Sequence, residues 1–356
     1  MPFGSPSPAN ERPLLELRHL ATHYVSSQGT RVVRAVDDVT LSVRAGETLG
    51  IVGESGSGKS TLALTILRIL PAAAQIVAGQ MMLEGEDLLQ KSEVEMQHVR
   101  GKRIAMILQD PMASLNPLFS VGDQVAEPIR VHEGATRQSA WARAIGLLKA
   151  VKIPSSETRV TQYPHEMSGG MRQRIVGAIG ISCEPRLLIA DEPTTSLDLT
   201  IQAQYLNLLG ELQREHNLAL IFITHNLGIV AKMCDQLAVM YAGRVVESGP
   251  VAQIFNTPVH PYTEALLNSI PRMTDSDKRL TAIDGQPPDL ASLPRGCSFA
   301  ARCTKAFDRC RMEAPPETFP SEGRTVRCWL AEPPGAAANG GRGADRADFK
   351  LESGAV

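Results

Sequence analysis

The sequence lacks a long apolar run. The most apolar stretch near its start, residues 62–70, is interrupted by Arg68 and followed by Pro71. No run approaches the ~20 apolar residues that a membrane-spanning helix needs. Residues 1–13 also lack a basic start followed by an apolar stretch, so no signal peptide is expected. We therefore expect the chain to stay in the cytoplasm.

The sequence also lacks an excess of either charge. It has 36 Lys and Arg against 38 Asp and Glu, and a formal net charge of −2. Proteins that bind nucleic acid usually carry a basic excess or a basic stripe, so nucleic acid is not an expected partner. Apolar residues make up 43% of the 356 residues, which is typical of a packed globular protein with a substantial core.

Cysteine is sparse, and disulfides are not expected in a reducing compartment. Of the six cysteines, Cys183 and Cys234 lie in apolar, helix-like surroundings and are interpreted as core residues. The other four are separated by five, six and seventeen residues and are Cys297, Cys303, Cys310 and Cys328. These spacings match neither a paired zinc knuckle nor a bacterial ferredoxin run. Spacing alone leaves zinc, an iron–sulfur cluster and four incidental thiols open.

What is present is an alternation of short apolar runs and helical segments. The expected strands are 14–20, 39–43, 49–52, 79–83, 187–190 and 218–224. Helices are expected over 60–70, ended by Pro71, and over 201–216. Strands that alternate with helices predict a parallel α/β sheet covered on both faces.

Three further stretches depart from this alternation. Residues 88–165 carry charged side chains at helical spacing and are expected to form a mostly helical insertion. Residues 237–247 predict a hairpin with its turn at Ala242-Gly243. The chain is loop-rich beyond residue 258, and its last stretch, 333–356, is expected to be disordered.

One glycine-rich segment fits the phosphate-binding pattern of glycine, any four residues, glycine, lysine, and serine or threonine. This segment, the phosphate loop, consists of Gly53, Glu54, Ser55, Gly56, Ser57, Gly58, Lys59 and Ser60. It follows an expected strand and opens an expected helix, so backbone N–H groups and the positive helix end face one place. Lys59 is then positioned to bridge terminal phosphates, and the Ser60 hydroxyl to bind Mg²⁺. The alternative is a plain glycine-rich turn.

Polar side chains follow three other expected strands. Residues 187–190 end in two adjacent acids, where Asp191 suits Mg²⁺ binding through water and Glu192 suits activation of an attacking water. Gln109 follows the apolar run 104–108 in the same manner, and His225 follows the strand 218–224. Proteins of the α/β class assemble their sites at these strand ends. The alternatives are solvated strand ends and a structural histidine.

Ser168, Gly169 and Gly170 precede a helical segment that contains Arg172 and Arg174. Ser168 is interpreted as an N-cap, and the glycines leave backbone N–H groups approachable. Read alone, this is only a helix start.

Together these residues resemble the ATP-binding subunit of ABC transporters over about residues 14–262. The elements occur in the family's order, namely Tyr24, the phosphate loop, Gln109, Ser168-Gly169-Gly170, Asp191-Glu192, Ser196-Leu197-Asp198 and His225. The resemblance implies a P-loop NTPase core of the α/β class, with an antiparallel β subdomain and a helical insertion. It also implies an ATP-binding domain over 14–265 and a disordered tail over 1–13.

The resemblance implies roles for these residues. Tyr24 stacks on adenine, and Thr61 joins the phosphate loop in binding the nucleotide. Glu192 is the base, His225 senses the γ-phosphate, and Lys59 acts on the phosphates. Ser60, Gln109 and Asp191 bind Mg²⁺, and the Gln109 segment faces the membrane subunits. Two such domains pair head to tail, with ATP between the phosphate loop of one and Ser168-Gly169-Gly170 of the other.

Three segments narrow the resemblance to the oligopeptide/dipeptide branch, namely 168–174, 192–204 and 260–263. The branch implies import of a peptide, or of a small cargo such as nickel. It implies a related but distinct second ATP-binding subunit, two transmembrane permeases and an external binding protein. The chain would then lie on the cytoplasmic face of the membrane.

Residues 296–303 resemble the C-terminal extension of that branch, here expected over 266–332 as a small loop-rich region. In the branch, the four cysteines are associated with a [4Fe–4S] cluster, which is expected to be structural or regulatory. Two rival functions are an ABC-type ATPase that acts on nucleic acid or ribosomes and a metal-binding regulatory protein. The first usually has tandem domains or long coiled-coil inserts, and the sequence contains neither.

Overall fold

Two β-sheets with helices around them organise the chain. The computed structural model describes residues 12–27, 29–195, 197–269 and 283–331. The tails expected over 1–13 and 333–356 lie outside the described residues, apart from residues 12 and 13. Of the helices described, none is both long and apolar enough to cross a membrane.

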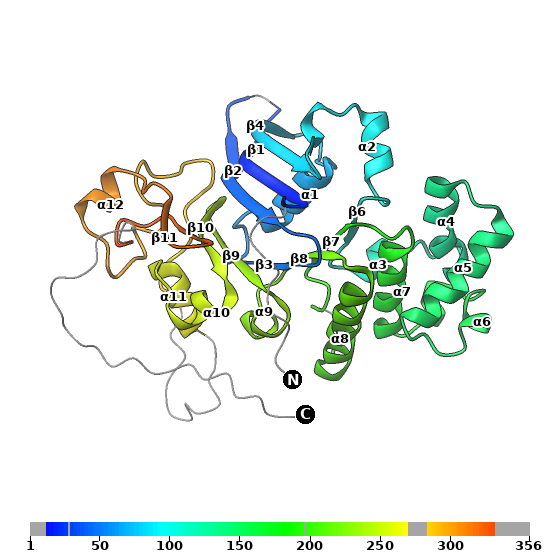
Figure 1. The fold of residues 1–356 in the computed structure, drawn as a ribbon. Helices are drawn as coiled ribbons and strands as arrows, with labels where there is room; N and C mark the ends of the chain where they lie inside the picture. The colour runs from blue at the N-terminus through cyan, green and yellow to red at the C-terminus, as the bar shows by residue number, and fades with distance from the viewer. Residues whose placement is uncertain (1–11, 28, 196, 270–282, 332–356) are drawn as a thin grey trace.

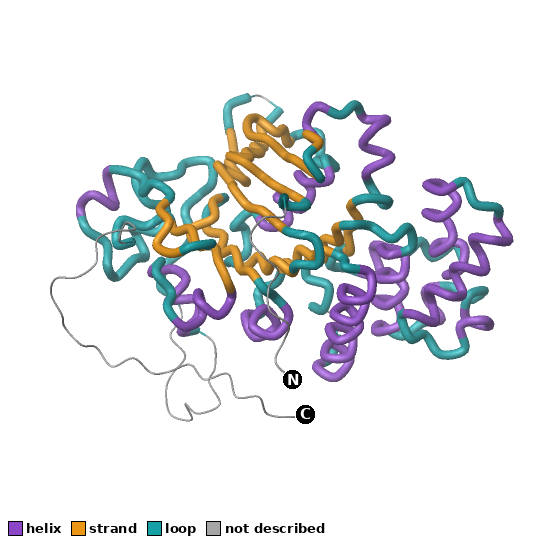
Figure 2. Tube along the Cα trace, viewed as in Figure 1, coloured by secondary structure: helices purple, strands orange, loops and turns teal. Residues whose placement is uncertain are grey.

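The larger sheet has eight strands and forms a continuous band in Figure 2. Its strands in spatial order are β11 (Thr318–Ser321), β12 (Arg324–Val326), β10 (Arg244–Pro250), β9 (Gln236–Tyr241), β3 (Thr48–Val52), β8 (Ala219–Ile223), β7 (Leu187–Asp191) and β6 (Ile104–Ile107). The five strands from β9 to β6 run parallel, as the alternating sequence predicts. Strand β7 reads as an uninterrupted apolar run because both of its faces are covered. Leu187 and Ile189 pack into one core cluster, and Leu188 and Ala190 into the other.

The smaller sheet is antiparallel. Its order is β2 (Val32–Val43), β1 (Leu15–Val25), β4 (Ala74–Leu83) and β5 (Glu86–Asp87). These strands extend beyond the apolar runs that predicted them because backbone pairing continues through half-exposed polar residues. Helix α1 (Lys59–Leu67) packs between the two sheets (Figure 1), with Leu62 and Ile66 in the core cluster that both sheets share.

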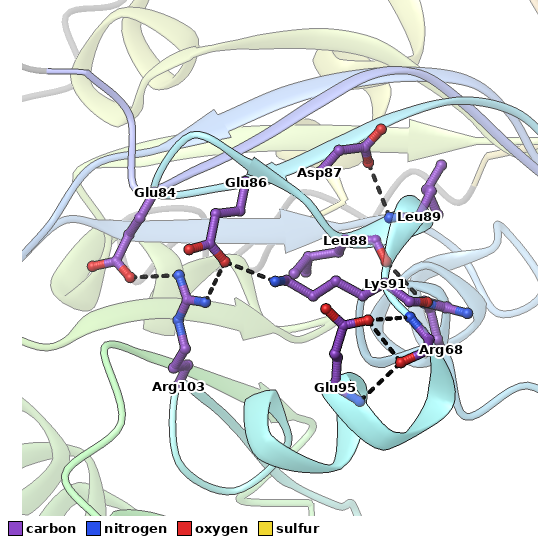
Figure 3. Close-up of polar contacts among 10 residues, drawn as sticks. Arg68, Glu84, Glu86, Asp87, Leu88, Leu89, Lys91, Glu95 and Arg103 are labelled. Atoms are coloured by element: carbon purple, nitrogen blue, oxygen red, sulfur yellow. Dashed lines mark hydrogen bonds and ion pairs between the residues drawn. The ribbon is translucent and has the colours of Figure 1, made fainter.

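Helix α1 does not end at Pro71, so that predicted boundary is wrong. The helix stops at Leu67 because Arg68 adopts a left-handed backbone with φ of 52°. The Arg68 side chain then donates to the carbonyl oxygens of Leu88 and Lys91, at 2.8 and 2.6 Å. Figure 3 shows these contacts. Tertiary hydrogen bonds at Arg68 therefore decide where the helix ends.

A network of ion pairs fastens the smaller sheet to the larger one. Arg103, just before β6, donates to Glu84 at 2.8 Å and to Glu86 at 2.7 Å, as Figure 3 shows. Lys91 lies 2.9 Å from Glu86. The hydrogen bond from Arg103, with the Lys91 contact, lowers the pKa of Glu86 to about 2.

Helices gather beyond β6, at one end of the large sheet (Figure 1). The helices beyond β6 are α3 (Pro111–Ser114), α4 (Val121–Glu133), α5 (Arg137–Ala150), α6 (Ser156–Arg159), η2 (Pro164–Glu166) and α7 (Gly169–Ile181). Two further helical elements, η1 (Leu88–Gln90) and α2 (Glu93–Val99), come before β6. Strand β6 lies inside the stretch 88–165 and belongs to the large sheet. The helical part, defined as residues 111–181, therefore follows a core strand.

The remaining helices are α8 (Leu199–His216), α9 (Leu227–Met233), α10 (Val251–Asn256), α11 (Pro261–Asn268) and α12 (Asp308–Met312). The expected hairpin joins β9 to β10, and its turn residues Ala242 and Gly243 both have positive φ, 49° and 81°. Strand β12 pairs with β10, so residues 283–331, called the extension below, continue the large sheet. The extension and the helical part lie at opposite ends of that sheet (Figure 1).

Candidate functional site

A cavity of about 570 Å³ opens at the carboxyl ends of the parallel strands. Its lining residues are Tyr24, Val33, Ala35, Gly53, Ser55, Gly56, Gly58, Lys59, Ser60, Thr61, Gln109, Glu192, His225 and Leu290. The phosphate loop follows β3, Gln109 follows β6, Glu192 follows β7 and His225 follows β8. Because neighbouring parallel strands end at one edge, residues far apart in the sequence meet at this cavity.

Two glycines of the phosphate loop are required by close backbone contacts. Gly53 and Gly58 have φ of 154° and 103°. A Cβ at Gly53 would lie 2.2 Å from the carbonyl oxygen of Met240, and a Cβ at Gly58 would lie 2.0 Å from that of Ala35. The loop therefore wraps against β9 and β2 in a shape that only glycine permits at these two positions.

Lys59, the first residue of α1, is buried with 7% of its surface exposed. Its Nζ donates to the carbonyl oxygens of Gly53 at 2.8 Å and Glu54 at 3.0 Å. Burial lowers the pKa of Lys59, and the charges of Glu192, Asp191 and Glu54 oppose that shift. The ammonium group thus spans the phosphate loop at the floor of the cavity.

Glu192 lies at the centre of a polar cluster. Its Oε2 accepts hydrogen bonds from Nε2 of Gln109 at 3.1 Å and from Oγ1 of Thr195 at 3.0 Å. Nδ1 of His225 lies 3.3 Å from its Oε1. The backbone of Glu192 has φ of 45°, a conformation that costs a non-glycine residue about 1–3 kcal/mol. Neighbouring contacts, including the Glu192 N–H bond to Ile223 at 2.9 Å, hold it there.

Asp191 is buried beside the phosphate loop, with 7% of its surface exposed. Burial raises the pKa of Asp191, and the negative charge of Glu192 raises it further. A hydrogen bond with Ser60 and the positive charge of Lys59 act in the opposite direction. Hydroxyl, amide and carboxylate oxygens are the ligands that Mg²⁺ prefers. Ser60, Gln109 and Asp191 supply one of each, so the donor set at this edge of the cavity suits Mg²⁺.

Of the other predicted nucleotide-binding residues, some line the cavity and some do not. Tyr24 and Thr61 line the cavity, with the Tyr24 hydroxyl 3.4 Å from the Thr61 hydroxyl. Glu54 and Ser57 belong to the phosphate loop but do not line the cavity.

Ser168, Gly169 and Gly170 lie apart from the cavity, at the start of α7. The Ser168 hydroxyl accepts the Met171 N–H at 3.4 Å, which confirms the predicted N-cap. Ser168 and Gly169 are exposed. Within one chain, this segment and the phosphate loop do not share a site.

Four lining or supporting residues escaped the sequence analysis, namely Val33, Ala35, Thr195 and Leu290. Thr195 supports Glu192, and its signal was its place three residues after that acid, in the strand-end loop. Leu290 reaches the cavity from the extension. No sequence pattern indicates Leu290, because its position depends on how the extension packs.

The clustered cysteines lie together. A second cavity, beside Phe299 and Trp329, is lined by Cys297, Cys303, Cys310 and Cys328. Backbone N–H groups donate to the sulfurs of Cys297, Cys303 and Cys328. Burial raises the pKa of all three thiols, that of Cys328 to about 11. In the described part of the chain, no group of three or more His, Cys, Asp or Glu side chains is arranged as a metal site.

The two remaining cysteines pack in the core, as predicted. Cys183 is buried, and Cys234 packs against two of the core clusters.

A phosphate loop between a parallel strand and a helix, with acids at the end of another parallel strand, defines an ATP-binding protein of the P-loop class. Residues 36–195 match the ABC transporter family, and residues 246–310 match the C-terminal region of oligopeptide/dipeptide transporters. The chain belongs to the ABC transporter family and carries the C-terminal region of its oligopeptide/dipeptide members.

Curated relatives are similar over most of the chain. The chain is 47% identical over 319 residues to the oligopeptide transport ATP-binding protein OppD of Haemophilus influenzae, covering 90% of this chain and 98% of that protein. It is 48% identical over 322 residues to OppD of Bacillus subtilis, covering 90% and 89%. A putative peptide import ATP-binding protein of Brucella ovis is 46% identical over 331 residues, covering 90% and 97%.

Solved structures share the fold. The structure of cbiO1 from Clostridium perfringens, part of the ABC transporter complex cbiONQ, has a TM-score of 0.59 and 28% identity, covering 69% of this chain and 92% of that one. A dimeric ATP-binding cassette bound to ADP and Pi has a TM-score of 0.60 and 23% identity, covering 67% and 98%. The predicted class, an α/β P-loop core with an antiparallel sheet and a helical part, is confirmed.

Proposed function

We propose that this chain is the ATP-hydrolysing subunit of an importer of oligopeptides or dipeptides. One observation carries the proposal: a single chain joins the strand-end cavity to the C-terminal region of oligopeptide/dipeptide transporters. The relatives named for peptide transport are similar over nine-tenths of the chain. Neither rival function, an ATPase acting on nucleic acid or ribosomes or a metal-binding regulator, draws support from these similarities.

In the proposed binding mode, the triphosphate of ATP lies along the phosphate loop. Backbone N–H groups of Ser55 to Ser60 and the positive end of α1 face the phosphate oxygens. Lys59 exchanges its bonds to the loop carbonyls for bonds to the terminal phosphates. Tyr24 stacks on the adenine, and Thr61 lies beside it.

In the proposed hydrolysis step, Glu192 orients a water and accepts its proton as the water attacks the γ-phosphate. The bond between the γ-phosphorus and the bridging oxygen breaks, and ADP and inorganic phosphate are released. Gln109, Thr195 and His225 hold that carboxylate, and His225 also contacts the γ-phosphate. Mg²⁺, when bound through Ser60, Gln109 and Asp191, supplies positive charge against the phosphate oxygens.

The proposed assembly needs a second ATP-binding subunit. Ser168 and Gly169, which are exposed, and Gly170 at the start of α7 complete the cavity of the partner, and the partner does the same for this chain. We propose a related but distinct partner, two transmembrane permeases that hold the pair at the cytoplasmic face of the membrane, and an external substrate-binding protein.

We also propose that Cys297, Cys303, Cys310 and Cys328 hold a [4Fe–4S] cluster. Support comes from the four thiols that line one cavity. When bound, the cluster would supply a rigid Cys₄ cross-link within the extension. Anaerobic purification should give a brown protein with iron and sulfide in a 1:1 ratio. Stoichiometric zinc without iron would refute this assignment.

Reconstitution tests the function as a whole. The chain, its partner subunit and the permeases are assembled in vesicles with the external binding protein and a panel of peptides. We expect peptide accumulation that requires ATP, with phosphate release stimulated by the binding protein loaded with peptide. ATP hydrolysis without peptide accumulation would contradict the cargo, and absence of phosphate release would contradict the proposal entirely.

A further inference from the structure

Glu54 is a residue of the phosphate loop whose side chain points away from the cavity. Its carboxylate is paired with Arg302 of the extension, 248 residues further along the chain. Arg302 Nη1 donates to Oε2 at 2.7 Å, and Nη2 donates to Oε1 at 3.0 Å. This two-pronged geometry fixes direction as well as distance, which a single contact would not.

The Arg302 guanidinium is itself held in place. Nε donates to the carbonyl oxygen of Asp284 at 2.9 Å, and Nη2 also donates to that of Ile283 at 3.1 Å. Nη1 lies 3.3 Å from the Tyr241 hydroxyl. Only 5% of the Arg302 side chain is exposed. The Glu54 side chain is 26% exposed, so the pairing is a part-buried contact of fixed geometry, unlike a fully solvated surface ion pair.

A second contact fixes the backbone of Glu54. Its N–H donates to the hydroxyl of Tyr262 in α11 at 3.0 Å. The Tyr262 ring is fully buried and packs on Tyr241 and Phe299, with ring centroids 4.5 and 5.3 Å apart. The carbonyl oxygen of Glu54 accepts a hydrogen bond from Nζ of Lys59. The side chain of Glu54 is thus bound to the extension and its N–H to α11, and its carbonyl is bound to the lysine of the cavity.

We infer that the extension positions the phosphate loop, and that Arg302 is a positioning residue for ATP, acting through Glu54. The inference deepens the proposed function and rests on it, since it names what shapes the ATP site. Arg302 precedes Cys303 directly, so the fold of the cysteine-bearing loop is coupled to nucleotide affinity.

Two physical effects predict that loss of Arg302 weakens ATP binding. First, a loop that is already ordered loses less conformational entropy when a ligand binds. Second, Arg302 neutralises an acid of the loop that receives the triphosphate. Without Arg302, the negative charge of Glu54 remains beside the phosphates and weakens binding.

The test compares four full-length proteins, the wild type and the variants Arg302→Met, Glu54→Gln and the double variant. Affinity for Mg²⁺ with the non-hydrolysable analogue AMP-PNP is measured by calorimetry. We expect Arg302→Met to weaken binding by about tenfold, equivalent to 1.4 kcal/mol. Glu54→Gln should weaken it less, because the amide carries no charge to repel phosphate. The double variant should bind more tightly than Arg302→Met alone.

That partial recovery distinguishes positioning from simple support of the fold. If Arg302 only stabilised the extension, removing the Glu54 charge would restore nothing, and the double variant would bind no better than Arg302→Met. That result would overturn the inference, as would equal affinities of wild type and Arg302→Met. Wild type without affinity for the analogue would overturn the proposed function as well, so the two failures are separable.

Lys305→Ala is the matched control. Lys305 also pairs an extension residue with an acid of the core, Glu264 at 2.6 Å, but both side chains are half-exposed and neither reaches the phosphate loop. We expect unchanged affinity. Near-ultraviolet circular dichroism of each variant checks that the aromatic packing of Tyr241, Tyr262 and Phe299 is kept. A loss of affinity in Lys305→Ala equal to that in Arg302→Met would overturn the inference.

Discussion

Nε2 of Gln109 donates to Oε2 of Glu192 at 3.1 Å, although the two residues are 83 positions apart. They meet because β6 and β7 are parallel neighbours whose carboxyl ends lie at one edge. Gln109 is also the link to α3 and the helical part. Gln109 therefore connects the Glu192 carboxylate at the cavity to the start of the helical part.

Replacing Glu192 should abolish turnover but not binding. We expect Glu192→Gln to lower the rate of phosphate release by at least ~10²–10⁴-fold, the contribution of a positioned base. The amide keeps hydrogen bonding to its neighbours, so ATP affinity should stay within threefold (about 0.6 kcal/mol). Single-turnover hydrolysis and calorimetry measure the two quantities. Glu211→Gln, at an exposed pair with Lys152, is the control. A Glu192→Gln variant of normal rate would remove Glu192 from the chemistry.

Lys59 should act mainly on nucleotide affinity. The Lys59→Ala variant removes charge-assisted hydrogen bonds worth ~1.5–3 kcal/mol each, so we expect affinity for ATP to fall tenfold or more. Titration with a fluorescent ATP analogue measures the effect, and Lys152→Ala, an exposed lysine outside the cavity, should bind as wild type. Equal affinities for Lys59→Ala and wild type would refute phosphate binding at this loop.

A buried ion pair joins the extension to the large sheet. Arg324 on β12 pairs with Glu247 on β10, and the two side chains are 6% and 0% exposed. Arg324→Met would leave a buried carboxylate without its cation, which costs about 3–5 kcal/mol. We expect urea unfolding to show a free energy of unfolding that is lower by this amount in Arg324→Met than in the wild type.

Arg311→Met provides the comparison for Arg324→Met, since Arg311 and its partner Asp308 are exposed. Its stability should change by less than ~0.5 kcal/mol. Similar unfolding midpoints for the two variants would contradict the importance of the buried pair.

His260 should make stability fall in mild acid. It is 1% exposed, accepts the Tyr262 N–H through Nδ1 at 3.0 Å, and burial lowers its pKa to about 3. Because the folded pKa lies below the unfolded value, only the unfolded chain binds this proton between the two. Stability is therefore full above the unfolded pKa of about 6.5 and decreases as pH falls towards the folded pKa.

Titration of His260 alone should lower the free energy of unfolding by about 1.4 kcal/mol between pH 7.5 and pH 5.5. Urea unfolding of wild type and His260→Asn at both pH values isolates it, because the other titrating groups are shared. We expect the pH dependence of His260→Asn to be weaker by that amount. Equal pH dependence in the two proteins would mean that His260 titrates normally in the folded state.

Local patterns predicted much of the fold and the site. The glycine spacing of residues 53–60 indicates the loop because backbone sterics act over neighbouring residues, and the strand-end positions of Gln109, Glu192 and His225 follow from parallel pairing. The end of α1 was mispredicted, because Arg68 is bound by backbone carbonyls of a later segment. The role of the cysteines could not be settled by spacing, since ligand sets are defined in space.

By itself, then, the sequence determined the order of strands and helices, the loop that curls around phosphates and the acids that face it. These depend on the spacing of residues along the chain. Only the tertiary structure decided that Arg302 binds Glu54, that Leu290 reaches the cavity, and that β12 extends the sheet. Such contacts join segments that are distant in sequence, so they depend on how buried surfaces pack and not on any local pattern.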